Sequence, residues 1–229
     1  MDSLSEALME ELNCETVFTI PLFGGIDVAE SVVVTWIIMA VLMVASLLLV
    51  RNLKVRKIRN KQAVLETAVS GIYGFFYDLL GESGKAYIPY LITVALYIGV
   101  ANIIGMFGFK SPTKDLNVTA TLAVLSILLV EVAGFRKKGL KGWLKGFTEP
   151  IAIITPINIL ELFIRPLSLC MRLFGNVLGA VVVMALIKQL VPLLIPLPFS
   201  FYFDIFDGLI QAYVFVFLTS LYIKEILED

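Results

Sequence analysis

Long apolar runs, separated by short polar stretches, set the pattern of this chain. Residues 31–50 are twenty positions without a charge, and the runs 86–109 and 117–135 contain a single charged residue, Glu131. An α-helix needs about twenty apolar residues to cross the roughly 30 Å hydrocarbon core of a bilayer. The pattern therefore predicts a first membrane span at 31–50 and a helical hairpin formed by 86–109 and 117–135.

The next apolar stretch, residues 156–190, is too long for one upright span. As a helix it measures roughly 50 Å, so it either breaks at Pro166 or lies strongly tilted. Its polar and small residues favour the second alternative, because they recur in steps of three and four and so share one helix face. These positions are Glu161, Arg165, Ser168, Arg172, Asn176 and Gly179. We expect one continuous, strongly tilted helix.

A second long, tilted helix is predicted at 199–226, where Asp204, Asp207 and Gln211 fall on one face by the same spacing. Residues 62–82 are amphipathic at helical spacing, which is typical of a helix lying at the membrane surface. An ordinary packed helix is the alternative for this segment. Together these elements predict an all-α integral membrane protein with about five membrane-embedded helices and one interfacial helix.

Charge is distributed unevenly about the predicted spans. Residues 1–30 are acidic and contain no Lys or Arg, so we expect a loosely structured external segment there. Basic residues concentrate in the predicted loops 51–61 and 136–149, and the basic loops of multi-span proteins face the cytoplasm. The N-terminus is therefore predicted outside and the C-terminus inside, with residues 31–229 forming a single membrane domain.

Composition argues against several other classes of protein. The chain is 59% hydrophobic and 16% charged, against about 45–50% and about 25% in soluble domains. A net charge of −1 provides no basic field for nucleic acid. The chain has no histidine and its two cysteines lie far apart, so neither a metal site nor a disulfide framework is indicated. Since the sequence also lacks a phosphate-binding glycine loop, we expect no cofactor and no nucleotide chemistry on this chain.

Arg172, in the middle of the long apolar run, is the strongest functional candidate. Moving a guanidinium to the centre of a bilayer costs about 2.5–3.5 kcal/mol on insertion scales, and arginine does not escape this cost by losing its proton. The alternative is a structural ion pair with Glu161 or Glu131. Glu161, however, lies about three turns away on the same helix, out of direct reach. It stands four residues from Arg165, so pairing there and lining a channel are both open.

Five short runs resemble subunit a of F-type ATP synthases. They are Asp115–Thr119 (DLNVT), Pro156–Glu161 (PINILE), Arg165–Met171 (RPLSLCM), Arg172–Asn176 (RLFGN) and Gln211–Phe215 (QAYVF). The resemblance extends from about residue 86 to the C-terminus. It implies that the two long helices curve around a rotating ring of c subunits, with peripheral-stalk b subunits and the other ATP synthase subunits as further partners.

The resemblance also implies a function. H⁺ or Na⁺ would pass through two half-channels, which open on opposite sides of a bacterial cell membrane, to and from a carboxylate on the ring. The essential arginine of the family matches Arg172. The residues expected to line the channels are Ser168, Asn176, Glu161, Gln211, Asp204, Asp207 and Glu131. Gly175 and Gly179 are expected to permit close packing of helices.

The chain departs from the family pattern at Val181, where many members carry an ionisable residue. Asp204 and Asp207 are the candidates to replace it. The alternative is that these two carboxylates stabilise the first turns of the last helix. Two competing functions are also considered. One is a secondary transporter for an anionic solute, which the lack of internal repeats disfavours, and the other is a purely structural scaffold.

Overall fold

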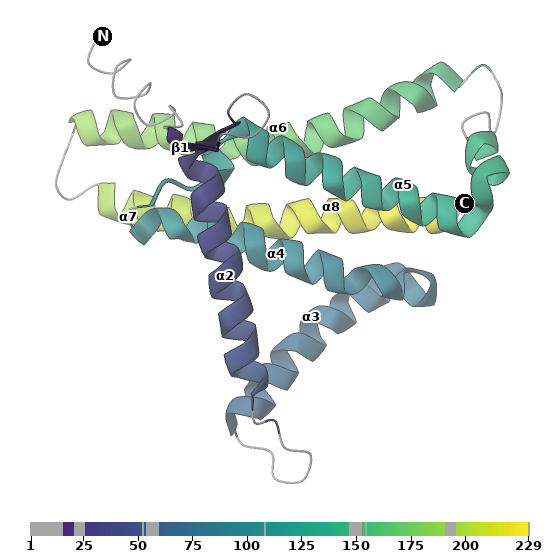
Figure 1. The fold of residues 1–229 in the computed structure, drawn as a ribbon, viewed down its shortest axis with the longest axis horizontal. Coiled ribbons are helices and arrows are strands. Elements are labelled where there is room, and N and C mark those ends of the chain that lie inside the picture. Colours follow the sequence, from purple (N-terminus) through teal and green to yellow (C-terminus); the bar gives the residue numbers. More distant parts are fainter. Residues whose placement is uncertain are drawn as a thin grey trace.

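The computed structural model describes residues 16–20, 26–51, 53, 60–107, 109–146, 153, 155–190 and 196–228. Most of these residues are helical (Figure 1). In chain order the elements are β1 (Thr16–Ile20), β2 (Ile26–Ala29), α2 (Glu30–Val50), α3 (Asn60–Gly84), η1 (Lys85–Tyr87), α4 (Ile88–Ile103), η2 (Ile104–Phe107), η3 (Pro112–Lys114), α5 (Leu116–Gly146), α6 (Thr155–Leu190), α7 (Pro196–Phe201), the π-helix η5 (Tyr202–Asp207) and α8 (Gly208–Glu228).

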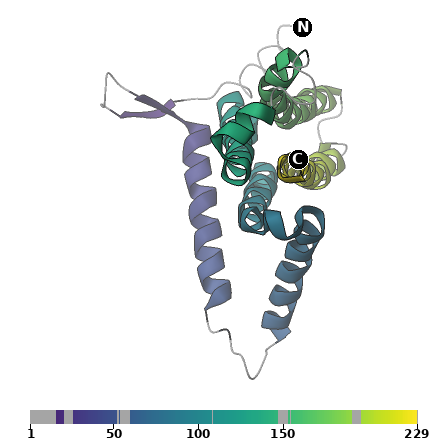
Figure 2. The same ribbon diagram turned by 90° about the vertical axis from the view of Figure 1, so that its right-hand side faces the viewer.

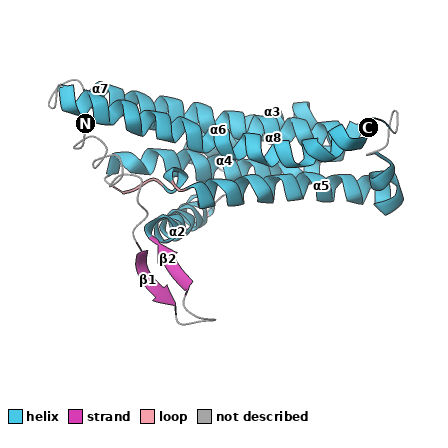
Figure 3. Cartoon of the chain, turned by 90° about the horizontal axis from the view of Figure 1, so that it is seen from above, coloured by secondary structure: helices cyan, strands magenta, loops and turns pink. Residues whose placement is uncertain are grey.

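Five helical stretches within the described residues are long and apolar enough to cross a membrane, and one of them joins α3 to α4. The prediction of an all-α, multi-span integral membrane protein is therefore confirmed. The axes of helices α4, α5, α6 and α8 are roughly aligned, whereas the axis of α2 lies crosswise to them (Figure 1, Figure 3). Seen along the bundle, α2 and α3 project away from it on the same side (Figure 2).

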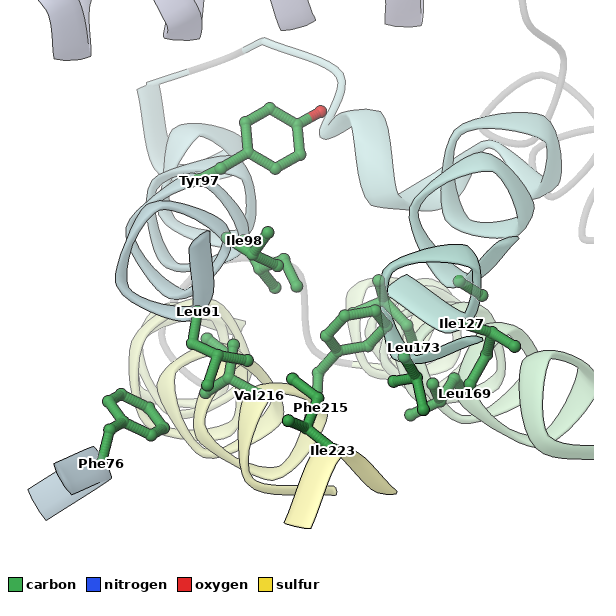
Figure 4. Packing of buried hydrophobic residues seen from close by; sticks show 14 of the residues in the cluster. Phe76, Leu91, Tyr97, Ile98, Ile127, Leu169, Leu173, Phe215, Val216 and Ile223 are labelled. Carbon is green, nitrogen blue, oxygen red and sulfur yellow. The ribbon is translucent and has the colours of Figure 1, made fainter. Parts of the chain in front are cut away.

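Helix α8 is the centre of the packing, since it contacts α3, α4, α5 and α6. Its buried Phe215, Val216 and Ile223 meet apolar side chains from the other helices, such as Leu91 of α4 and Leu173 of α6 (Figure 4). Lipid tails are as apolar as these side chains, so close packing, and not escape from water, holds such helices together. The fold therefore depends on how closely neighbouring helices approach α8.

Three predicted segments are helices in the structure, with bounds close to those expected. The first span corresponds to α2, and the hairpin corresponds to α4 and α5. The long helix α6 is unbroken from Thr155 to Leu190 and includes Pro166, as the single-face periodicity indicated. A proline is tolerated inside a membrane helix because neighbouring groups and local adjustments satisfy the freed carbonyl.

The prediction that the N-terminal segment is loosely structured is wrong for its described residues. Strands β1 and β2 pair antiparallel, with Thr16 opposite Ala29 and Ile20 opposite Ile26, and Thr19 donates a hydrogen bond to Asp27 at 2.7 Å. The run Thr-Val-Phe-Thr-Ile is rich in β-branched and aromatic residues, which favour strands. Residues 1–15 and 21–25 lie outside the described residues, as does most of the predicted loop 51–61.

One predicted loop is helical instead, and one predicted helix is longer than expected. The loop expected at 136–149 is helical through Gly146, where α5 ends, although Gly139 has a φ of 68° and changes the direction of the helix. Leu and Lys around it are good helix formers, and glycine adopts positive φ without strain. In the same way α3 extends beyond the predicted 62–82, with a break at Gly81 (φ 65°). Whether α3 lies at the membrane surface stays a prediction.

The predicted last helix, 199–226, is also interrupted. It begins earlier, with the short helix α7, and becomes a π-helix over Tyr202–Asp207 before α8 continues. Pattern reasoning assumed an α-helical repeat throughout and so placed Asp204 and Asp207 on one face. The π-helix changes the number of residues per turn, yet Asp204 and Asp207 still line one cavity, whereas Gln211 does not line it.

The N-terminal end of α2 is anchored by polar contacts to the start of α5. The hydroxyl of Ser31 donates to Asp115 at 2.5 Å, and both residues are buried. The other oxygen of Asp115 accepts the backbone N–H of Asn117 at 2.9 Å, which satisfies one of the free donors at the start of α5. Glu30 also forms an ion pair with Lys110 at 3.3 Å. Asp115 thus joins the first span to the hairpin.

We expect Asp115→Ala to destabilise the protein by about 1–3 kcal/mol, because it removes a helix cap and leaves Ser31 buried without its partner. Denaturant unfolding of the purified chain in detergent measures this change. Asp27→Ala, which removes an exposed bond, is the matched control and should change stability by less than about 0.5 kcal/mol. Equal effects of the two substitutions would contradict the anchoring role.

Candidate functional site on the long helix α6

Arg172 lies on an exposed face of α6. An adjacent face of the helix carries the buried Leu169, Cys170 and Leu173, and Cys170 lies 3.6 Å from the Thr119 hydroxyl of α5. The Arg172 guanidinium makes a weak contact of 3.5 Å with the hydroxyl of Ser168. Within the part of the chain that the structure describes, Arg172 forms no ion pair, so the alternative of a structural pair with Glu161 or Glu131 is wrong.

Arg165, two turns earlier on α6, shows the contrasting arrangement. Its Nη2 donates to Glu161 at 3.0 Å and to Glu225 of α8 at 2.7 Å. The guanidinium also stands 4.9 Å from the centre of the Tyr222 ring, a favourable cation–π geometry. Its side chain is only 13% exposed. The pairing of Glu161 with Arg165, one of the two open alternatives, is therefore present, and a channel role for Glu161 is untested.

The structure reveals Glu225 as a functional candidate that the sequence analysis missed. It stands 60 residues after Arg165 in the chain, and no spacing rule connects residues on two different helices. The only available signal was a carboxylate near the end of a helix predicted to pack beside α6. The contact places two carboxylates and one arginine on the side of Arg172 that faces the C-terminal end of α8.

Gly175 and Gly179 do not pack against another helix of the described chain. Both are exposed or half-buried, and a Cβ atom built on either would have no neighbour within 4 Å. Whether they permit the close approach of a helix therefore stays a prediction, since no helix of the described residues packs against them. They lie on the same side of α6 as Arg172. Because glycine has no side chain, nothing from these two positions projects beside the guanidinium.

On the other side of Arg172, a cavity of about 170 Å³ lies between α4, α6, α7 and η5. Its walls include two carboxylates, two ammonium groups and an amide: Asp204, Asp207, Lys114, Lys188 and Asn176. A cavity of this size and polarity has room for several water molecules. It reaches α6 at Asn176, one turn from the exposed arginine.

Both aspartates line this cavity, and Asp207 also bonds to a neighbouring helix, whereas Asp204 bonds to the preceding turn of its own helical run. Asn176 donates from Nδ2 to Asp207 at 2.5 Å, and Ser200 donates to Asp204 at 2.7 Å. Asp207 therefore bonds to α6, and the alternative that it serves only to cap its own helix does not account for this contact. Val181, where the resemblance led us to expect an ionisable residue, is buried in the wall of the same cavity.

Two other candidates lie away from these groups. Gln211 is 6% exposed, and its Nε2 has no hydrogen-bond partner among the described residues. It is not among the residues that line the cavity. Glu131 accepts a hydrogen bond of 2.8 Å from the indole of Trp143, beyond the break at Gly139. This contact fastens the last turns of α5 to the helix before the break.

The fold and the site together define a class: an integral membrane protein whose long helices hold charged groups within apolar segments. A model of the ATP synthase A chain family matches residues 32–224, and the chain belongs to this family. It is similar to ATP synthase subunit a of Moorella thermoacetica, with 37% identity over 203 residues that cover 88% of this chain and 92% of the relative.

Two further relatives agree with this assignment. A protein of Propionigenium modestum named ATP synthase subunit a, sodium ion specific, is 37% identical over 225 residues, which cover 90% of this chain and 76% of the relative. ATP synthase subunit a 2 of a Bradyrhizobium species is 34% identical over 201 residues, with 87% and 89% coverage. The family is a membrane subunit of the ATP synthase complex, and ion transport is its role.

The two arginines of α6 should respond differently to substitution. Arg165→Met leaves Glu161 and Glu225 without their partner, and we expect it to lower the free energy of unfolding by about 1–3 kcal/mol. This range is smaller than that for a fully buried pair, because both carboxylates are half exposed. Arg172→Met removes no ion pair and should change stability by less than about 0.5 kcal/mol. Denaturant unfolding in detergent compares them. A large loss of stability in Arg172→Met would show that this arginine has a structural partner.

Proposed function

We propose that this chain is the ion-conducting stator subunit of a rotary ATP synthase. In this function it passes H⁺ or Na⁺ through two offset half-channels to and from a carboxylate on the c-subunit ring. The observation that carries the proposal is the exposed guanidinium of Arg172, which has no ion-pair partner among the described residues, on a membrane-embedded helix. A charge in that position is costly, so we expect a group on a partner outside this chain to offset the cost of burying the Arg172 guanidinium.

The physical role of Arg172 is electrostatic. Two unit charges 4 Å apart attract by roughly 4 kcal/mol at an effective dielectric constant of 20. An arginine at this distance therefore favours the ionised form of a passing carboxylate strongly enough to make it release its ion. Lysine in the same place would be able to lose its proton, whereas arginine keeps its charge and prevents ions from crossing directly between the half-channels.

The two half-channels would lie on either side of Arg172. On one side, the cavity containing Asp204 and Asp207 reaches Asn176, one turn from the arginine. On the other side, the half-exposed carboxylates of Glu161 and Glu225 surround Arg165. Because the positive charge of Arg172 lies between these acidic groups, an ion moves from one side to the other only by way of the ring.

The open face of α6 suits the ring as a partner. Gly175 and Gly179 leave space beside Arg172, and small residues let another helix approach closely. In the proposed assembly the peripheral-stalk b subunits and the other subunits hold this chain fixed in a bacterial cell membrane, with its N-terminus outside. Na⁺ is retained beside H⁺ as the ion, since the relative from Propionigenium modestum is named as sodium ion specific.

Arg172→Ala should abolish ion-driven ATP synthesis by the whole complex in reconstituted vesicles, because no fixed charge would discharge the ring carboxylate. Imposing pH and sodium gradients separately identifies the ion used by the unaltered complex. Arg165→Lys, which keeps the charge of the paired arginine, is the control and should retain synthesis. Normal synthesis by Arg172→Ala would favour a structural scaffold, and solute uptake by the chain alone would favour a transporter.

A second-site substitution tests the cavity. We expect Asp207→Asn to slow ion-driven ATP synthesis, because it removes from the cavity wall the carboxylate that bonds to Asn176, one turn from Arg172. Val181 lines the same cavity, so adding Val181→Glu to Asp207→Asn should restore part of the rate. Leu186→Glu, on an exposed side chain of the same helix, provides the control and should restore nothing. Equal rates for the two double variants would contradict a role for this cavity.

A further inference from the structure

Helix α5 carries an exposed apolar stripe that ends at a group of cations. The side chains of the stripe lie within about 100° of one another around the helix, and each is close to half exposed: Val124, Leu125, Leu128, Val132 and Phe135. In a helix that crosses a membrane, such a stripe faces lipid. Arg136 and Lys137 follow the stripe directly and are exposed as well. Because a charged side chain is costly among acyl chains, the hydrocarbon beside this face ends near Phe135.

Beyond this point the chain turns back. Gly139 has a φ of 68°, and the last turns of α5 leave the axis of the helix (Figure 1). The indole of Trp143 donates to Glu131 at 2.8 Å, although the two residues are 12 apart in the chain. In an uninterrupted helix they would stand about 18 Å apart along the axis, so this bond forms only because of the turn at Gly139. Residues 136–143 are called the basic hook below.

The basic hook combines cations with apolar groups. Leu140 is 57% exposed, and the half-buried Trp143 has the apolar ring and polar N–H that are typical of side chains at a membrane–water interface. Three of the four cations of the hook are exposed and Lys138 is half-buried: Arg136, Lys137, Lys138 and Lys141. The orientation of a span is enough to account for basic residues at its end. It does not account for the turn, the indole bond or the exposed leucine.

We propose that the basic hook is a binding site for an anionic phospholipid. Arg136, Lys137 and Lys141 hold the phosphate of the headgroup, since clustered Lys and Arg beside a membrane helix attract anionic lipids and donate charge-assisted hydrogen bonds to phosphate oxygens. The acyl chains lie against Phe135 and Leu140. An acidic protein segment would pair with the same cations but would not extend along the apolar stripe, whereas one lipid molecule covers both surfaces.

Glu131 and Trp143 are positioning residues in this site. Their bond holds the turns after Gly139 against the helix before it, and so keeps Lys141 and Leu140 beside the end of the stripe. The inference goes beyond the proposed function and does not depend on it, because lipid binding requires only that α5 lies in a membrane.

The two tryptophans of the chain, Trp36 and Trp143, allow the site to be measured separately from the rest of the surface. The full-length chain with Trp36→Phe is reconstituted in phosphatidylcholine vesicles, and the fluorescence of Trp143 is quenched with brominated phosphatidylglycerol or with brominated phosphatidylcholine. We expect phosphatidylglycerol to be preferred at least about fivefold. The chain with Trp143→Phe reports on Trp36, which is 50% exposed on α2, and should show no preference.

Removing the cations of the site, in the chain with Trp36→Phe, should abolish the preference at Trp143. The variant combines Arg136→Gln, Lys137→Gln and Lys141→Gln. A matched control removes three exposed cations from other parts of the chain and should keep the preference: Arg51→Gln, Lys61→Gln and Lys85→Gln. Equal losses in the two triple variants would show a general attraction between charges and would overturn the site.

Glu131→Ala, in the same chain, separates the arrangement of the site from its total charge. This substitution removes a negative charge, so a surface that acts by charge alone would prefer phosphatidylglycerol more strongly. Because the hook loses its bond to Trp143, we expect the preference to fall at least about threefold instead, as a site does when it is no longer preorganised. If this variant does not reconstitute, the triple variants alone decide.

Three results would overturn the inference. They are an absence of preference at Trp143 in the chain with Trp36→Phe, an equal or stronger preference in Glu131→Ala, and displacement of the brominated phosphatidylglycerol by soluble glycerol phosphate, which would identify a site for free phosphate. Since none of these measurements involves ion flow, their failure would leave the proposed function standing. Likewise, normal ATP synthesis by Arg172→Ala would leave the lipid site standing.

Discussion

A guanidinium inside an apolar environment is stable only when another group offsets the loss of its water. Helix α6 carries two such groups on one face, and they meet this constraint in opposite ways. Arg165 is enclosed by Glu161, Glu225 and Tyr222, which ties α6 to α8. Arg172 has only Ser168 within hydrogen-bonding reach among the described residues. Since the two share a helix and a chemistry, their different surroundings indicate which one is structural and which one is available to another chain.

The rest of the fold serves to present α6 in this way. Its apolar side packs on α5 through Leu169, Cys170 and Leu173, which leaves the face with Arg172 open. At one end Arg165 binds α8, and near the middle Asn176 binds Asp207. Because helices in a bilayer gain little from hiding apolar surface from each other, these few polar contacts fix the rotation of α6 and therefore the direction of its arginine.

The sequence was sufficient to predict the long helices and the unbroken α6, and to single out Arg172 as a candidate, because apolar length and helical periodicity are local properties of a chain. It was insufficient where partners come from elsewhere. Glu225 meets Arg165 across 60 residues, and Gly208, which follows the π-helix, accepts a hydrogen bond from Asn102 of α4 across 106 residues. The same holds for Gly175 and Gly179. Small residues predict the close approach of another helix, but they do not say which molecule supplies that helix.

The most direct test of this account is an experimental density map of the assembled membrane sector at a resolution that shows side chains. The account predicts that the guanidinium of Arg172 faces an acidic side chain of the c-subunit ring across the open face of α6, within a few ångströms and beside Gly175 and Gly179. A map in which Arg172 faces lipid, or is paired with a carboxylate of its own chain, would contradict it.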